Sequence, residues 1–308
     1  MKAFAIRMRP LGPWSTPWHA DTIFAALCWQ VRWLAGEVQL IQLLGRFRSG
    51  DPPFVISDAF PEGWLPRPLS ADLLQVPHSN LGRKPPEWIP EAAFRALLRG
   101  EGVLPPQAEP NDPIVPTRRL HASISRKSGT TAEGGQLFEI PEWRVRTKDG
   151  QGGDGNLILY FRTAEDPSRL CSLFRCLGAS GFGKKRSSGQ GAFEVIAEPG
   201  PCGWLDDFER ANAFVALSHF IPAAKDPTDG LWRLVTKYPK FAAEAPVANA
   251  FKGRATMLRP GSVFRSVGPP RGHYGRVLFD LFPEFPSAAQ YALAFAVPLR
   301  WHAEKADA

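Results

Sequence analysis

The chain has 308 residues, of which 44% are hydrophobic, so it can bury a sizeable core and is long enough for two domains or one large one. Its 37 basic and 30 acidic residues give a net charge of +7, which favours an anionic partner such as nucleic acid or a membrane surface. No stretch approaches the roughly 20 apolar residues of a membrane span, and no secretory signal opens the sequence, so we expect a cytoplasmic protein.

The N-terminal region predicts a strand over residues 3–8 and then a helix that starts at an Asp21 cap, runs to about Ala35 and is ended by Gly36. Helical spacing predicts that its buried face consists of Phe24, Leu27, Cys28, Val31 and Leu34. A second strand is expected over residues 54–61.

Residues 61–113 are rich in proline and are interpreted as an insertion with one short helix, near Glu91 to Arg99. Tryptophans in the proline-rich loops fit a protein-partner interface; they are Trp14, Trp18, Trp64 and Trp88. Residues 114–146 predict a long, projecting hairpin with a basic first arm and a tip at 128–135 that is rich in glycine, serine and threonine.

A buried strand over residues 157–161 leads into a second helix, with Asp166 as its N-cap, Pro167 in its first turn and Gly178 at its end. Next comes the glycine loop, Gly181–Gly191, in which four glycines bracket three consecutive cations. Bare backbone N–H groups beside cations form an anion cradle, although a solvated basic turn has the same composition. Neither common nucleotide motif fits, because Arg186 replaces a required fingerprint glycine and Lys185 replaces the hydroxyl residue of a P-loop.

A short strand over residues 193–197 completes the order strand–helix–strand–strand–helix–strand, that of the split β-α-β unit. From about residue 199 the pattern partly restarts, with strands expected over 213–220, 231–235 and 291–301. We predict an α+β protein with two ferredoxin-like (RRM-like) domains. The first covers residues 1–200, including the insertion and the hairpin, and the second, more degenerate, covers residues 201–308.

The glycine loop resembles the signature loop of the RAMP superfamily of CRISPR proteins. Other segments are similar, in the same order, to the RAMP family that caps the 5′ end of the guide RNA in type III-A (Csm) interference complexes. These segments are residues 12–29, Ser57–Pro61, His121–Arg126, Gly261–Phe264 and residues 291–298. Ala25 stands where that family is associated with glycine.

The resemblance implies a non-catalytic crRNA-binding subunit of antiviral defence that grips the repeat-derived 5′ tag, with the hairpin as a thumb that kinks the guide. It also implies contacts with the large polymerase-like subunit and a neighbouring RAMP backbone subunit, target RNA nearby, and no membrane. The candidate RNA-binding residues are Ser15, His19, Arg118, Arg119, His121, Ser123, Ser125, Arg126, Gly181, Phe182, Gly183, Lys184, Lys185, Arg186, Ser187, Ser188, Gly189, Gly191, Lys252, Arg254 and Arg259.

Two alternatives remain open. A metal-independent RAMP endoribonuclease would use His19 or His121 as general base and Lys184 or Arg186 to stabilise the transition state, but the sequence shows no close histidine pair. A scaffold that binds only protein is the other. Neither a metal site nor a cofactor is expected, because the four cysteines form no C-x-x-C pair and acids such as Asp58 look isolated.

Overall fold

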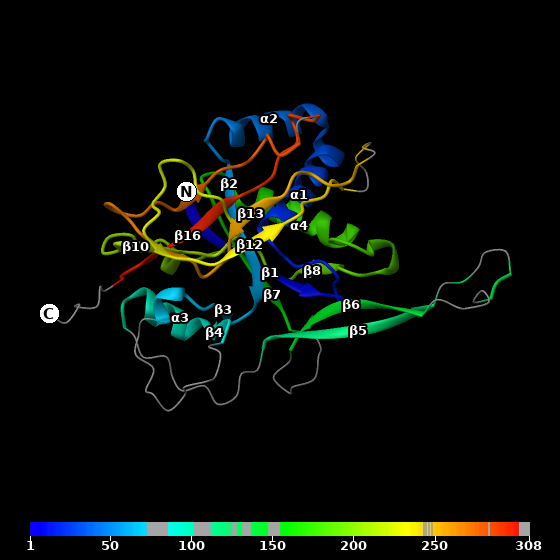
Figure 1. Cartoon of the computed structure of the whole chain (residues 1–308), viewed down its shortest axis with the longest axis horizontal. Coiled ribbons are helices and arrows are strands. Elements are labelled where there is room, and N and C mark those ends of the chain that lie inside the picture. The colour runs from blue at the N-terminus through cyan, green and yellow to red at the C-terminus, as the bar shows by residue number, and fades with distance from the viewer. Residues whose placement is uncertain are drawn as a thin grey trace.

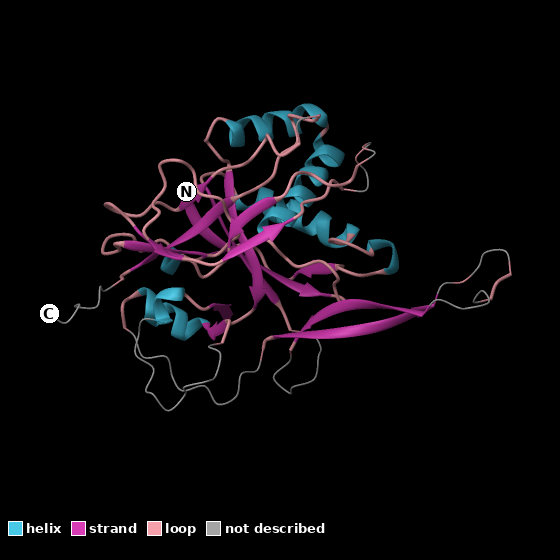
Figure 2. Ribbon diagram, viewed as in Figure 1, coloured by secondary structure: helices cyan, strands magenta, loops and turns pink. Residues whose placement is uncertain are grey.

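The computed structural model describes residues 1–72, 86–101, 112–122, 124, 128–130, 137–146, 155–242, 245, 247, 249–282 and 284–301. Helices and antiparallel sheets are combined in one chain, which confirms the predicted α+β class (Figure 1, Figure 2). None of the described helices is long and apolar enough to cross a membrane.

The first sheet has the order β2-β7-β1-β8, and all of these neighbours are antiparallel. Its strands are β1 (Lys2–Pro10), β2 (Phe54–Pro61), β7 (Leu157–Thr163) and β8 (Phe193–Val195), with β9 (Gly200–Pro201) also paired to β1. The connecting helices are α1 (Ala20–Ala35) and α2 (Glu37–Arg48) between β1 and β2, and α4 (Pro167–Ser180) between β7 and β8. The strand order is that of the split β-α-β unit expected for this region.

The start of α1 differs from the prediction. The helix begins at Ala20, and its backbone N–H donates to Asp58 Oδ1 of β2 at 2.8 Å, so Asp58 satisfies the helix end in place of the predicted Asp21 cap. Asp21 instead accepts from Lys237 Nζ at 2.9 Å. Phe24 and Leu27 are buried as predicted, but Leu34 is 60% exposed because the chain turns at Gly36 into α2, which the sequence analysis missed.

The Asp166 cap and Pro167 in the first turn of α4 are confirmed. The predicted end at Gly178 is wrong, since the helix continues to Ser180 and Gly181 ends it with φ of 79°. Gly178 is needed for packing: a Cβ there would lie 2.3 Å from the carbonyl oxygen of Phe193, so the residue lets β8 cross the helix closely.

The second sheet has the order β11-β14-β10-β16-β15. Its strands are β10 (Ala213–Ala216), β11 (Gly230–Leu231), β14 (Val263–Arg265), β15 (His273–Gly275) and β16 (Leu293–Leu299); beside it β12 (Leu234–Lys237) pairs with β13 (Ala255–Leu258). The described residues after 200 contain no α-helix, only the turn η4 (Gly203–Leu205). A ferredoxin-like second domain therefore stays a prediction.

The two sheets share one core. From β7, the Arg162 side chain is 2% exposed; it pairs with Asp206 at 2.9 Å and donates to the carbonyls of Gly272 and Ala296. The Tyr291 hydroxyl donates to the Ile56 carbonyl of β2 at 3.2 Å. The predicted division near residue 200 thus falls between two sheets. The largest hydrophobic cluster contains residues from both of them.

The predicted hairpin is confirmed as β5 (Ile114–Ala122) paired with β6 (Leu137–Val145), and it projects from the body (Figure 1). Most of its predicted tip lies outside the described residues. The insertion contains β3 (Trp64–Pro66), η1 (Leu69–Asp72), β4 (Trp88–Pro90) and the predicted helix, α3 (Glu91–Leu98). Because Phe94 and Leu97 of α3 are buried, the described part of the insertion packs on the body.

Candidate nucleic-acid interface

The glycine loop has buried ends and an exposed centre. Gly181, Phe182 and Gly191 are buried, whereas Lys184, Lys185, Ser187, Ser188 and Gly189 are exposed around the turn η3 (Arg186–Ser188). Gly183 and Gly189 have φ of 79° and 81°, as the glycine spacing suggested. The exposed centre therefore offers cations and backbone, while the ends fix the loop to the protein.

The loop is fastened to residues 14–18. The Phe182 ring stacks on Trp18, and the backbone N–H of Lys184 donates to Thr16 Oγ1 at 2.9 Å. A Cβ at Gly183 would lie 2.4 Å from Thr16 Cβ, so this glycine is required for close approach of the two segments as well as for its φ.

The same segment anchors the hairpin. Ser15 Oγ hydrogen-bonds to Gln190 Oε1 and to the Pro141 carbonyl, and Gln190 Nε2 hydrogen-bonds to Glu142. The Trp14 and Trp143 backbones exchange bonds of 3.1 and 2.9 Å. Ser15, predicted to contact RNA, thus lies in the joint between the glycine loop and the hairpin.

Two predicted site residues meet at the hairpin surface. His121 stacks on Phe138 with ring centroids 5.6 Å apart, and Lys185 Nζ lies 6.0 Å from the same ring. Arg118 and Arg119 are exposed, and Arg118 pairs with Glu139 across the hairpin at 3.0 Å. Three other predicted residues, Ser123, Ser125 and Arg126, lie outside the described residues.

The predicted cations of the second sheet are dispersed. Arg254 is exposed, and Arg259 is half-buried and pairs with Glu87 at 3.6 Å. Lys252 donates to the Ala289 carbonyl at 2.9 Å, and burial lowers its pKa. Lys252 is therefore held in the structure rather than presented on the surface.

A pocket of about 380 Å³ lies where these segments meet. Its lining comes from residues 14–19, β2, the insertion, the hairpin base, β12 and loops after residue 216, and includes Trp14, Trp18, Trp88 and Trp143. The predicted exposed tryptophan interface is therefore wrong: Trp14 and Trp18 are 3% and 5% exposed, and Trp64 and Trp88 are half-buried. Trp14, Trp18 and Trp88 line the pocket instead.

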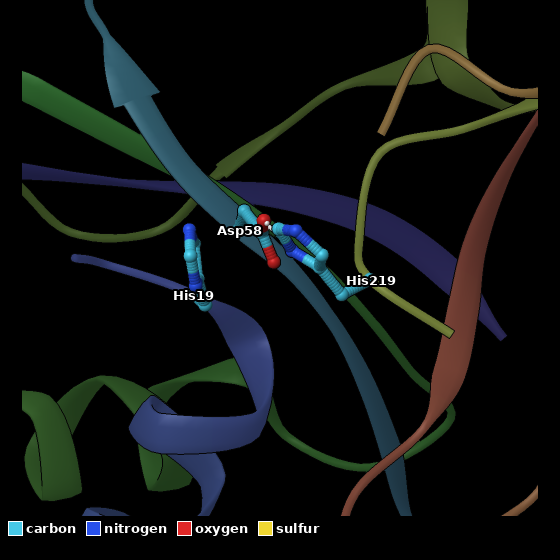
Figure 3. Close-up of side chains that lie close together, drawn as sticks. All are labelled: His19, Asp58 and His219. Carbon is cyan, nitrogen blue, oxygen red and sulfur yellow. Dashed lines mark hydrogen bonds and ion pairs between the residues drawn. The ribbon is translucent and has the colours of Figure 1, made fainter. Parts of the chain in front are cut away.

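Three polar side chains meet at this pocket (Figure 3). His19 lies at the start of α1, Asp58 on β2 and His219 just after β10. The rings of His19 and His219 have centroids 4.2 Å apart, and His219 Nδ1 lies 2.7 Å from Asp58 Oδ2. Lys237 Nζ lies 3.1 Å from His19 Nδ1. The sequence expectation of no close histidine pair is thus wrong, and Asp58 is not isolated.

These contacts fix protonation states. Burial, together with the neighbouring His219 and Lys237, lowers the pKa of His19 from 6.5 to about 3, so the ring is neutral at physiological pH. Burial alone would raise the pKa of Asp58, but the charge and hydrogen bond of His219 lower it overall, so it is a carboxylate. His19 Nδ1 accepts from the Lys237 ammonium, which leaves the proton on Nε2.

The ligand atoms of His19, Asp58 and His219 lie within 4.8 Å of one another, and two imidazoles with a carboxylate are ligands that Zn²⁺ accepts. However, both Asp58 oxygens already accept hydrogen bonds, and the Lys237 ammonium lies beside His19. The arrangement favours hydrogen bonding to a ligand over cation binding.

Sequence reasoning missed His219 and Lys237, which the fold brings to His19 from more than 190 positions away. Neither stands in a pattern that signals a site. Asp58 was noticed as part of the segment Ser57–Pro61 and as an isolated acid, but not as a partner of the histidines.

Comparison with solved structures finds matches over the whole chain. A chain of a Csm1-Csm4 cassette in complex with AMPPNP matches with a TM-score of 0.61 and 21% identity, covering 98% of this chain and 99% of that one. A chain of the cassette in complex with pppApA matches with 0.60 and 20%, covering 97% and 99%. A chain of a Csm3-Csm4 subcomplex in the type III-A CRISPR-Cas interference complex matches with 0.61 and 11%, covering 97% and 100%.

Csm4 is the subunit that all three of these complexes contain. At such identities the likeness establishes a shared fold over the full length of both chains. No protein-family model matches the sequence, and no curated protein matches it at the sequence level.

Proposed function

We propose that this chain is a Csm4-type, non-catalytic crRNA-binding subunit of a type III-A CRISPR interference complex. The observation that carries the proposal is the likeness over 98% of this chain and 99% of a chain from a Csm1-Csm4 cassette. The sequence segments that resemble the same family support it independently, because the resemblance lies in the residues themselves.

The described surface suits a single RNA strand. The exposed cations of the glycine loop and the arginines of the hairpin lie on two elements that the Ser15–Gln190–Glu142 hydrogen bonds join. Phosphate contacts from such cations set the register of a strand, while splayed bases supply specificity. In this proposal the strand is the repeat-derived 5′ tag and the hairpin is the thumb at the boundary between tag and spacer.

The proposed protein partners follow from the complexes that contain the matched folds. Those structures hold Csm1 and Csm3 beside Csm4. We propose equivalents here, a large polymerase-like subunit and a neighbouring RAMP backbone subunit, with target RNA nearby. Two ferredoxin-like domains also belong to this proposal, as does a cytoplasmic location.

The test is isolation of the protein from its own cells, with the associated RNA sequenced from the 5′ end. We expect discrete RNAs that share one repeat-derived 5′ end and differ beyond it. RNA with random ends, or none, would overturn the proposal.

One observation favours a second function, the RAMP-type endoribonuclease. His19 and His219 lie in ring contact beside a carboxylate and an ammonium, and paired imidazoles can act as general base and general acid. Against it, a pKa of about 3 makes His19 a poor base and keeps it from donating as an imidazolium at neutral pH.

The two functions separate in a cleavage assay. End-labelled repeat RNA is incubated with wild type, His19→Ala, His219→Ala and His121→Ala, the last because His121 is the other candidate base. We expect no specific product from any of them. Specific cleavage by wild type that disappears in His219→Ala would establish the nuclease.

A further inference from the structure

We infer that the pocket beside His19 and His219 receives one unstacked nucleobase of the bound RNA, whose edge hydrogen-bonds to the two imidazoles. This inference rests on the proposed RNA-binding function and adds to it the place where a base is read. It is carried by the hydrogen-bond partners of the two rings and by the chemistry of the pocket wall.

The polar cluster consists of His19, Asp58, His219 and Lys237. Its inner atoms already form hydrogen bonds within the protein. Asp58 accepts from the Ala20 backbone through one oxygen and from His219 Nδ1 through the other, and Lys237 donates to His19 Nδ1 and to Asp21. These bonds join α1, β2, β12 and the loop after β10. A purely structural role accounts for all of them, but it does not account for the outer nitrogens.

Neither Nε2 atom bonds to a described residue, and neither is sealed from solvent, so both are open to the pocket that their rings line. Because Nδ1 of His19 accepts, its Nε2 carries a proton and donates. Nδ1 of His219 bonds to Asp58, which leaves its Nε2 outside that bond. Adjacent rings thus present two polar ring nitrogens to the pocket, which can hydrogen-bond to groups along a nucleobase edge.

The remaining wall suits the flat face of a base. Trp14, Trp18, Trp88 and Trp143 line the pocket, and its 380 Å³ lies within the roughly 300–1,000 Å³ of small-ligand sites. Arg233 and Arg259 also line it, which places positive charge where the backbone of an inserted nucleotide would pass. Single-stranded RNA is recognised by this combination of aromatic faces, edge hydrogen bonds and cations.

The pocket is also next to the proposed path of the strand. Trp18 contacts the glycine loop through its stack with Phe182, and the same residue lines the pocket. Trp143 belongs to the base of the hairpin and lines the pocket too. An RNA strand that is held by the glycine loop and the hairpin therefore passes the mouth of the pocket.

The experiment scans the RNA with abasic nucleotides. A synthetic RNA that copies the 5′ end of the copurified guide is made with one abasic site at each position in turn, and each affinity is measured by fluorescence anisotropy. We expect one position at which base removal weakens binding by roughly 5- to 150-fold, the range for loss of one stacked base.

Two variants assign that position to the pocket. His219→Asn keeps a donor for Asp58 but removes Nε2, whereas Val235→Trp narrows the pocket and replaces no residue of the polar cluster. Each variant should bind the intact RNA about as weakly as wild type binds the RNA that is abasic at that position. Removing the base at that position should then cost each variant little further affinity. Arg118→Ala, on the hairpin, should keep the full abasic effect.

The outcomes are separable. If wild type binds none of these RNAs, the proposed function fails and this inference fails with it. If wild type binds the intact RNA but no abasic position matters, or if the sensitive position stays equally sensitive in both pocket variants, only the base-reading inference fails.

Discussion

The Phe182 ring stacks on the indole of Trp18, with centroids 4.4 Å apart and planes inclined by 26°. This contact joins the glycine loop to the wall of the central pocket. It shows why a loop that looks like an exposed basic turn has a hydrophobic residue between its first two glycines. The Phe182 side chain is an anchor, and the cations beyond it are positioned by that anchor.

Phe182→Ala should therefore lower the free energy of unfolding by about 3–5 kcal/mol, the usual cost of truncating a buried phenylalanine. Urea unfolding followed by tryptophan fluorescence measures it. Phe182→Leu, which retains much of the volume, is the matched control and should cost less. A loss below 1 kcal/mol for Phe182→Ala would show that the stack does not hold the loop.

Charge and geometry in the glycine loop should have separable effects on RNA binding. Lys184→Ala/Lys185→Ala should weaken binding and flatten its salt dependence, by about one phosphate's slope for each lysine–phosphate interaction that the substitution removes. Gly183→Val should weaken binding more and change the slope less, because its Cβ would meet Thr16 and displace the loop.

Gly189→Ala is the control for backbone strain, because nothing lies near its Cβ although its φ is positive. Affinities for the guide RNA across a salt series, with circular dichroism to verify folding, give the measurement. If the lysine and Gly183 variants bind like wild type at every salt concentration, the loop is not an RNA cradle.

Acid should destabilise the protein through His19. Its pKa falls from 6.5 to about 3 on folding, so between these values the unfolded chain binds a proton that the folded chain does not. The stability that depends on a neutral His19 is fully present above pH 6.5. It is lost as the pH falls, at up to about 1.4 kcal/mol per pH unit.

His19→Gln removes this titration, so its free energy of unfolding should fall less steeply than that of wild type. Urea unfolding at pH 6.5, 6.0 and 5.5 tests it in a window above the usual range of carboxyl groups. Parallel pH dependences of the two proteins would contradict the burial of a neutral His19.

Arg162 should contribute more to the free energy of unfolding than any exposed arginine. Arg162→Ala leaves Asp206 without its ion pair and removes the guanidinium hydrogen bonds to the Leu205, Gly272 and Ala296 carbonyls, so we expect a loss of about 3–5 kcal/mol. Arg118→Ala breaks only the exposed pair with Glu139 and should cost about 0–1 kcal/mol. Stability is measured by thermal and urea unfolding. Similar losses for Arg162→Ala and Arg118→Ala would show that Arg162 does not join the two sheets.

Local patterns predicted the elements that depend on local causes. The Asp166 cap, Pro167 in the first turn of α4 and the hairpin over 114–146 follow from neighbouring residues, and all are present. The Asp21 cap failed because a residue from another strand, Asp58, reaches the same helix end. A lone His219 carries no signal in the sequence, because its role depends on partners that only the fold supplies.

The pocket is lined by residues from Trp14 to Pro260. During synthesis, a nascent chain displays the glycine loop well before Arg259 and Pro260 leave the ribosome, so it has the charged loop but not the finished pocket. The wall of the pocket is therefore complete only in a chain that has been translated past Pro260.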